Sequence, residues 1–364
     1  MTRAAIATTL SILALPAAAQ EEVDIASSLG DLTVTPIVQG LDMPWGFDVA
    51  PDGTIFITEK AGSLLTVRDG ASERISGLPE LYTQRQGGLL DVMLPRDFAE
   101  TREIFLTYSR PQKGGAGTAV LKATLPEGAT ALENAQTIFE MAPGSSGGAH
   151  FGSRIREAPD GTLFVTIGER GDRPAAQDLS RHNGSVIRIN RDGSVPDDNP
   201  FVGQNGAQPE IWSYGHRNPQ GAAFDASGQL FVVEHGAQGG DEVNRIAPGA
   251  NYGWPVISYG RHYSGAQIGE GTAKDGMEQP EFYWDPSIAP SDAVFLEGGD
   301  WNGDMLVGSL KFNYISRLTG DPLREAERLE SEATLRVRDV DQGPDGDIWF
   351  LSEVNGTLYR AALP

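Results

Sequence analysis

The feature that most constrains the fold of this chain is a short unit that recurs along its length. Each copy is a Pro- or Asp-rich turn that closes on Gly and leads into an apolar strand, usually followed by a second turn and strand. Four clear copies read PDGTIFITEKAGSLLTVRDG from Pro51, PDGTLFVTIGERGD from Pro159, DASGQLFVVEHG from Asp225 and PDGDIWFLSEVNGTLYRA from Pro344. Two weaker copies read PRDFAETREIFLTYSR from Pro95 and DWNGDMLVGSLKFNYISRL from Asp300.

This repeat predicts an all-β, six-bladed β-propeller of four-stranded antiparallel blades. Asp-Gly and Asn-Gly pairs reverse the chain tightly because Gly accepts a positive φ and Asp hydrogen-bonds to local amides. Helical periodicity is scarce, and short alternating runs between turn residues are typical of an all-β protein. One blade cannot bury both of its faces, so blades must stack around an axis. The alternatives are a β-sandwich, which needs far fewer residues, and a β-helix, whose period is shorter and stricter.

The first residues have the pattern of a cleaved signal peptide. Arg3 is followed by an apolar run at residues 4–15 and by small residues at 17–19. The run is shorter than the roughly 20 residues that span a bilayer, and a retained anchor or buried helix is the alternative. We therefore expect a signal peptide at residues 1–19, a single propeller domain at residues 20–364, and a periplasmic or secreted protein without membrane insertion. The chain has no Cys, so disulfides cannot stabilise it.

The charge of the chain excludes some classes of partner. The formal net charge is −22, which argues against binding to nucleic acid or to anionic membrane surfaces. In a protein this acidic, a place where several arginines converge is informative about function.

One histidine lies in a loop that suits a ligand site. None of the five histidines has a metal-type spacing to another, and without Cys a zinc or copper site is not expected. His150 lies in GGAHFGSRI, where glycines on both sides allow the backbone to approach a ligand closely. The alternative is an ordinary surface histidine.

Basic residues gather in three further segments. Arg217 and Asn218 lie in IWSYGHRNPQG just before a predicted strand, and Lys311 ends a strand in GSLKFNY. The guanidinium of Arg217 suits a carboxylate, or else bonds neighbouring carbonyls structurally. Arg336 and Arg338 in LRVRDVDQG are two residues apart, hence on one face of a strand, where they repel unless an anion or flanking acids such as Asp339 and Asp341 balance them.

A fourth segment, VVEHGAQGGDEVNRIAPGANYGWP, suits a hard cation. Gly236 and Ala237 offer backbone carbonyls, and Asp241 and Glu242 offer the carboxylate oxygens that calcium prefers. No EF-hand spacing is present, and a solvated acidic turn is the alternative.

Taken together, these motifs resemble the soluble PQQ-dependent sugar dehydrogenases (PQQ is pyrroloquinoline quinone), in particular their aldose sugar dehydrogenase branch. The resemblance runs from MPWGFDVAPDG at Met43 to the last repeat. In family order, the motifs are QGGLLDVMLPRDF, GGAHFGSRI, GSVIRINRDGSVPDDNPF, GHRNPQG and EVNRIAPGANYGWP.

The resemblance implies oxidation of aldose sugars at the anomeric carbon to lactones, with hydride transfer to PQQ and electrons passed to an external acceptor. His150 matches the general base of the family. The positions that match PQQ-binding residues are Gln86, Arg217, Asn218, Lys311, Arg336 and Arg338. The carbonyls of Gly236 and Ala237 match the ligands of the calcium beside the cofactor, and Glu242 and Tyr252 match a second, structural calcium site.

Departures from the family bear on specificity. Ala149 stands where the glucose enzymes carry an acidic residue beside the base, so another group must orient His150 if orientation is needed. Trp284 lies one position out of register with the cofactor-stacking tryptophan of the family and is not assigned that role. The chain is shorter than the glucose-specific branch, which favours a broad-specificity monomer.

Two other functions remain open from the sequence. Calcium-dependent lactonases are also six-bladed propellers, but they need axial carboxylates and an Asn as direct metal ligands. A non-catalytic propeller that binds a glycan or protein partner is the second alternative, because fold does not fix function.

Overall fold

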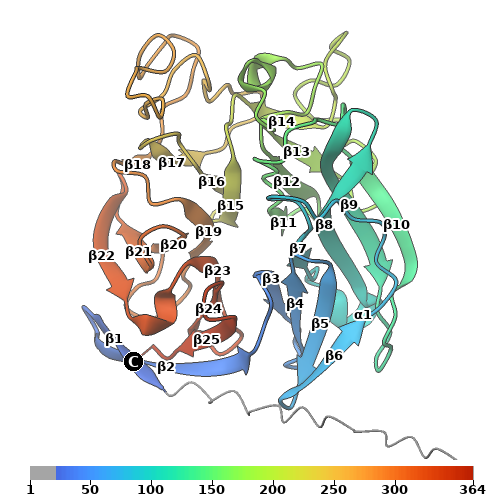
Figure 1. Cartoon of the computed structure of the whole chain (residues 1–364), viewed down its shortest axis with the longest axis vertical. Coiled ribbons are helices and arrows are strands. Elements are labelled where there is room, and N and C mark those ends of the chain that lie inside the picture. The colour runs from blue at the N-terminus through green and yellow to red at the C-terminus, as the bar shows by residue number, and fades with distance from the viewer. Residues whose placement is uncertain (1–21, 364) are drawn as a thin grey trace, which may run out of the picture.

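The computed structural model describes residues 22–363, which form a ring of six antiparallel β-sheets (Figure 1). Five sheets have four strands, and the sixth has five. The predicted six-bladed β-propeller is therefore confirmed. The proposed signal peptide at residues 1–19 lies outside the described residues and stays a prediction. No helix in the described part is long and apolar enough to cross a membrane.

Each blade is a run of consecutive strands, numbered here from the ring's first complete sheet. Blade 1 contains β3 (Pro44–Val49), β4 (Ile55–Glu59), β5 (Ser63–Arg68) and β6 (Ala71–Ile75). Blade 2 contains β7 (Leu89–Met93), β8 (Glu103–Gln112), β9 (Gly115–Thr124) and β10 (Glu133–Glu140), with the short helix α1 (Phe98–Thr101). Blade 3 contains β11 (Ile155–Glu157), β12 (Leu163–Ile167), β13 (Ser185–Ile189) and β14 (Ile211–Tyr214), with the 3₁₀ turn η1 (Arg173–Gln177).

The other three blades follow the same order. Blade 4 contains β15 (Pro219–Phe224), β16 (Leu230–Glu234), β17 (Asp241–Arg245) and β18 (Phe282–Trp284). Blade 5 contains β19 (Pro290–Phe295), β20 (Met305–Ser309), β21 (Tyr314–Thr319) and β22 (Arg324–Glu330), followed by the 3₁₀ turn η2 (Glu332–Thr334). Blade 6 contains β23 (Val337–Gln342), β24 (Ile348–Ser352), β25 (Thr357–Ala361), β2 (Gly30–Gln39) and β1 (Val23–Ser27).

Blade 6 closes the ring by joining the two ends of the chain. Strand β2 pairs with β25, for example Val34 with Ala361 and Gln39 with Thr357. Figure 1 shows the N-terminal strands in blue beside the last strands in red. Because the sheet contains both ends of the chain, opening the ring would require breaking the β2–β25 hydrogen bonds.

The apolar core is divided among the interfaces between blades. Six clusters of buried side chains each join two neighbouring blades. For example, Phe56 of blade 1 packs with Leu106 of blade 2, and Phe231 of blade 4 packs with Met305 of blade 5. Stacking of blades therefore buries the faces that a single sheet would leave exposed.

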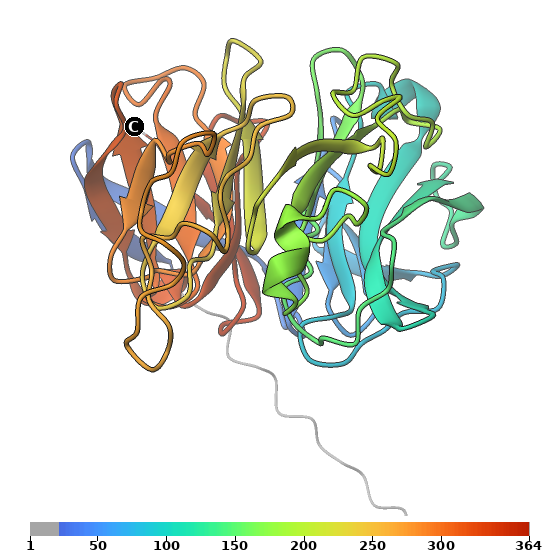
Figure 2. The same cartoon turned by 90° about the horizontal axis from the view of Figure 1, so that it is seen from above.

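The six repeated turns occupy one position in the fold. Each connects the first strand of a blade to the second, as Pro51 does between β3 and β4 and Pro344 between β23 and β24. The Asp52 carboxylate accepts the Thr54 N–H at 3.0 Å, as the repeat predicts. Because antiparallel strands alternate in direction, the blade-to-blade loops and the second-to-third strand loops gather at the opposite end (Figure 2). That opposite end carries the candidate site.

Candidate functional site

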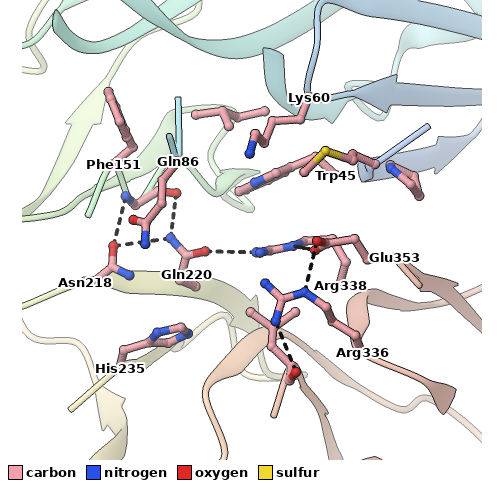
Figure 3. Close-up of a pocket in the computed structure, with 15 residues that line it drawn as sticks. Trp45, Lys60, Gln86, Phe151, Asn218, Gln220, His235, Arg336, Arg338 and Glu353 are labelled. Carbon is pink, nitrogen blue, oxygen red and sulfur yellow. Dashed lines mark hydrogen bonds and ion pairs between the residues drawn. The ribbon is translucent and has the colours of Figure 1, made fainter. Parts of the chain in front are cut away.

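A pocket of about 190 Å³ opens at this end of the ring, over the start of the inner strands (Figure 3). Four of the predicted cofactor residues line it, although they come from three different junctions between blades: Gln86, Asn218, and the neighbouring Arg336 and Arg338. The sequence is thus right that these distant segments meet.

His150 lies beside the pocket in the loop between β10 and β11. Its φ is 55°, which is unusual for a residue other than Gly. Its backbone N–H donates to Oε1 of Gln86 at 2.6 Å. Gly168 allows the loop to pack, because a Cβ at that position would stand 2.1 Å from the His150 carbonyl oxygen. The conformation of His150 is therefore held by the tertiary structure.

Arg170 holds the same loop from behind. The guanidinium donates to the carbonyls of Ala149 and of Gly147, the latter at 2.6 Å, and lies over the Phe151 ring at 3.2 Å. Burial lowers the pKa of Arg170 to about 10, so the side chain stays charged at neutral pH. An arginine bound to carbonyls in this way fixes the loop that presents His150.

Glu169 is the group that orients His150. Its carboxylate accepts a hydrogen bond from Nδ1 of the imidazole, and its side chain is only 1% exposed. A proton on Nδ1 leaves the lone pair on Nε2, which is then the basic atom. Burial lowers the pKa of His150 below its usual value, the Glu169 hydrogen bond opposes this, and the Arg217 charge adds to it. The imidazole is therefore neutral and able to accept a proton at pH 7.

The orienting group could not be assigned from the sequence, because Ala149 has no carboxylate. Glu169 supplies it from the loop that follows β12, and its neighbour Arg170 supplies the loop contacts. The available signal was an adjacent acid and base, Glu169 and Arg170, one residue after the largely apolar strand LFVTI, at the end of the blade where the other site residues lie. Their partner could not be read from the sequence.

For the sugar oxidation that the resemblance implies, Glu169→Gln is expected to lower kcat/KM by about 10- to 100-fold, the usual effect of losing an orienting partner. Loss of the carboxylate removes an influence that raises the pKa of His150, so this pKa falls further. The rising limb of the pH–rate profile should therefore move to lower pH, which steady-state kinetics between pH 4 and 8 would measure. Glu133→Gln, on the exposed strand β10, is the matched control; an unchanged profile in Glu169→Gln would contradict the assignment.

Arg336 and Arg338 face the pocket together and share one carboxylate. Glu353, from the loop between β24 and β25, accepts hydrogen bonds from Nε of Arg336 at 2.9 Å and from Nε of Arg338 at 3.3 Å. Burial opposes ionisation of Glu353, yet the charges of Arg338 and Arg336 hold its pKa below the usual value. One carboxylate cannot neutralise two guanidinium groups, so positive charge remains at the pocket.

Two expectations about this pair need correction. Arg336 is not on the strand, since β23 begins at Val337 and Arg336 has a φ of 52°. The balancing acid is Glu353 and not the expected Asp339 or Asp341, because Asp339 instead contacts Arg154, which is buried among the inner strands of the ring.

Arg217 is a buried cation that lacks an acidic partner within 4 Å among residues 22–363. It lies just before β15, as predicted, and only 7% of it is exposed. Its Nη1 donates to the His235 carbonyl at 3.0 Å, while its buried Nε has no hydrogen-bond partner. Burial lowers the pKa of Arg217. Both interpretations of this residue thus hold in part: it bonds one carbonyl and keeps a donor for a ligand.

Asn218 and His235 line the first pocket, whereas Arg217 beside them lines an adjoining pocket that shares His235. Asn218 Oδ1 accepts the Gly152 N–H at 3.3 Å. His235 donates through Nε2 to the Pro290 carbonyl at 2.8 Å. Burial and the charges of Arg217 and Arg338 lower the pKa of His235 to about 3, so it is neutral and adds no positive charge.

Lys311 lies at the same end of the molecule but not in the pocket lining. The preceding residue, Leu310, does line the pocket, and its carbonyl accepts a hydrogen bond from Nη1 of Arg336. The Lys311 side chain is exposed, and its ammonium lies over the Phe312 ring at 4.7 Å. Its assignment to the cofactor stays a prediction.

The predicted calcium residues form a second, adjoining pocket in blade 4. Gly236, Glu242 and Tyr252 line it, together with Arg217 and His235, and Ala237 follows Gly236 in the same loop. The Asp241 carboxylate is fully engaged: it accepts the Gly236 N–H at 2.7 Å, the Ser287 hydroxyl and the Ala289 N–H. Asp241 therefore shapes the loop rather than offering a free oxygen.

Glu242 faces a second buried carboxylate. It pairs in register with Glu234 across β16 and β17, and its carboxylate accepts a hydrogen bond from Asn244 Nδ2 at 3.3 Å. Burial and the Glu234 charge raise the pKa of Glu242 well above its usual value. The hydroxyl of Tyr252 donates to the Arg245 carbonyl at 2.5 Å, so only its backbone carbonyl is left for a cation.

Trp45, which the sequence analysis missed, lies between two arginines at the pocket floor. Its ring is 4.6 Å from the Arg154 guanidinium and 5.5 Å from that of Arg338. Trp284 packs in the core between blades 4 and 5, and its Nε1 donates to Glu325 at 3.4 Å. The described fold therefore places Trp284 in the core and Trp45 at the pocket.

Comparisons with known proteins agree with this geometry. A model of the glucose/sorbosone dehydrogenase family matches residues 41–360. Aldose sugar dehydrogenase YliI of Escherichia coli is 40% identical over 335 residues, which cover 88% of this chain and 90% of that relative. These matches confirm the resemblance drawn from the motifs.

Solved structures show the same relationship. The soluble aldose sugar dehydrogenase of Escherichia coli in its apo-form matches with a TM-score of 0.88 at 38% identity, covering 91% of this chain and 99% of that one. The PQQ-bound form of aldose sugar dehydrogenase from Streptomyces coelicolor matches with a TM-score of 0.75 at 25% identity, covering 90% and 98%.

Proposed function

Because the chain belongs to the glucose/sorbosone dehydrogenase family and is an oxidoreductase, we propose that it oxidises aldose sugars at the anomeric carbon to lactones, using PQQ and calcium. The observation that carries this proposal is a cationic pocket next to a histidine that a buried carboxylate orients. In a protein of net charge −22, such a pocket requires a specific anionic ligand.

The residues present fit PQQ, which carries three carboxylates. Arg217 keeps a buried Nε without a partner, and Arg336 and Arg338 share a single acid. Arginine forks bind carboxylates in two-point contacts. Gln86 and Asn218 supply polar groups at the same pocket, so these residues would hold the cofactor.

The residues present also fit calcium, which prefers hard oxygen donors. In the described chain no three His, Asp or Glu side chains are grouped to hold a metal. Backbone carbonyls would therefore have to complete the shell, as the resemblance implies for Gly236 and Ala237 at the calcium beside the cofactor; Glu242 and Tyr252 would belong to the second, structural site. The buried Glu234–Glu242 pair lies beside them, and a bound calcium ion would favour the ionised form of Glu242, whose pKa is raised without it.

The chain's own part in the reaction is binding, orientation and one proton transfer. Nε2 of His150 accepts the proton of the anomeric hydroxyl, while Glu169 holds the tautomer and stabilises the imidazolium that forms. Loss of that proton and of a hydride from the anomeric carbon gives the lactone. When bound, PQQ supplies the hydride acceptor and calcium supplies a Lewis acid. Gln86 connects the two regions, because it lines the pocket and accepts the His150 N–H.

The remaining parts of the proposal concern the setting of the enzyme. We propose export to the periplasm or beyond by the signal peptide, a monomeric state, and an external acceptor that takes the electrons. A lactonase with axial metal ligands gains no support, because axial carboxylates of Asp91, Asp292 and Asp339 are paired with Arg154.

Reconstitution tests the proposed function. Purified protein given PQQ and calcium should reduce an artificial dye with a panel of aldoses, and omission of either addition should abolish the activity. Measured PQQ binding without dye reduction on any sugar would refute the sugar oxidation, and activity that persists without PQQ or calcium would refute the cofactor assignment.

A further inference from the structure

Lys60, in the turn between β4 and β5, is a cation at the pocket that is not among the site residues predicted from the sequence. It lines the pocket together with Gln86, Trp45 and Arg338, and its ammonium end is directed into it (Figure 3). Its Nζ donates to the Arg85 carbonyl at 2.7 Å. Within residues 22–363, no carboxylate lies within the 4 Å of an ion pair with it.

The surroundings of Lys60 carry an excess of positive charge. Burial lowers the pKa of Lys60, and the charges of Arg338 and Arg336 lower it further, opposed by Glu353. Both Glu353 oxygens already accept the two arginines. Three cations therefore share one acid, which is costly for partly buried charges unless an anion joins them.

Lys60 is also connected to the catalytic loop. Its ammonium donates to the Arg85 carbonyl. The residue that follows Arg85 is Gln86, whose side chain accepts the His150 N–H at 2.6 Å and whose own N–H donates to the Gly148 carbonyl at 3.1 Å. The backbone carbonyl of Lys60 accepts the Leu89 N–H at 3.1 Å. The lysine thus touches both ends of the loop that carries Gln86.

We propose that Lys60 is an additional carboxylate-binding residue of the cofactor pocket, pairing with a carboxylate of the quinone. This inference rests on the proposed function and extends it by one residue. The charge does the binding, while the Arg85 contact only orients the side chain. A strongly hydrated ammonium on a flexible stem suits one carboxylate oxygen, as the neighbouring guanidinium forks suit two.

The test is direct titration of apoprotein with PQQ in excess calcium, followed by quenching of tryptophan fluorescence. Lys60→Met is expected to raise the Kd for PQQ by about 10- to 100-fold, the range for losing a hydrogen bond to a charged group. Lys60→Arg keeps the charge and should stay within about threefold of wild type. Lys60→Gln keeps a donor for Arg85 but not the charge, so it should resemble Lys60→Met.

A matched control removes the same charge elsewhere. Lys122→Met, in β9 and ion-paired to Glu103 at 2.6 Å, should leave the Kd for PQQ unchanged. Raised ionic strength should reduce the difference in Kd for PQQ between wild type and Lys60→Met, because salt screens the attraction between the ammonium and the carboxylate.

The outcomes separate the two proposals. If wild type binds no PQQ, the proposed function fails. If wild type binds PQQ and Lys60→Met binds it equally well, only the inference about Lys60 is overturned. If Lys60→Gln binds like wild type while Lys60→Met does not, Lys60 merely tethers the loop and the charge assignment is wrong.

Discussion

His150→Ala should lower kcat/KM for aldose oxidation by about 10²- to 10⁴-fold, the contribution typical of a positioned general base. The anomeric hydroxyl would lose its proton acceptor, and no other described imidazole contacts Glu169. The Kd for PQQ should change little, because the side chain lies beside the pocket and not in its lining. Dye-reduction kinetics and fluorescence titration with PQQ measure the two quantities separately.

The pH dependence provides the control for this prediction. In wild type, activity should rise as His150 loses its proton, at a pH below the usual histidine value because burial lowers the pKa. This limb should disappear in His150→Ala. Residual activity within tenfold of wild type, or an unaltered limb, would show that another group accepts the proton.

Arg154→Met should lower the free energy of unfolding by about 3–5 kcal/mol, the range for breaking a buried ion pair. Arg154 is fully buried among the inner strands of the ring and contacts acids of three other blades: Asp91 at 2.8 Å, Asp292 at 3.0 Å and Asp339 at 3.2 Å. Without it, Arg156 remains within ion-pair distance of Asp91 and Asp292 but not of Asp339. Chemical denaturation at pH 7 measures the difference.

The same substitution should also weaken PQQ binding. Arg154 lies against the Trp45 ring and donates to the Gln220 carbonyl at 3.2 Å, and both residues line the pocket. The control is Arg245→Met, whose pair with Glu281 at 2.8 Å involves an arginine side chain that is 50% exposed. Exposed pairs contribute about 1 kcal/mol or less. Equal destabilisation by the two variants would contradict a special role for the buried ion pairs of Arg154.

The local sequence determined the blades, because their signals act over a few residues. The Asp-Gly turns hydrogen-bond within themselves, as Asp160 does to Thr162 at 2.9 Å, and apolar alternation fixes which side chains face the next blade. Six turns therefore predicted six blades. The position of Arg217 and Asn218 immediately before β15 could also be read directly, since GHRNP is followed by a strand.

The tertiary structure alone decided which charges meet. Glu169 pairs with His150, Glu353 with Arg336 and Arg338, and Arg154 with acids of three blades. Glu169 and Glu353 lie 15 to 19 residues from their partners and meet them where the loops of one blade fold together. Arg154 meets acids of three other blades only because the ring brings the inner strands to a common axis. Closure by β2 against β25 joins the two chain ends, so no segment of the chain discloses it by itself. A local pattern shows that a side chain is charged, but the energy of burying that charge depends on partners that only the folded chain supplies.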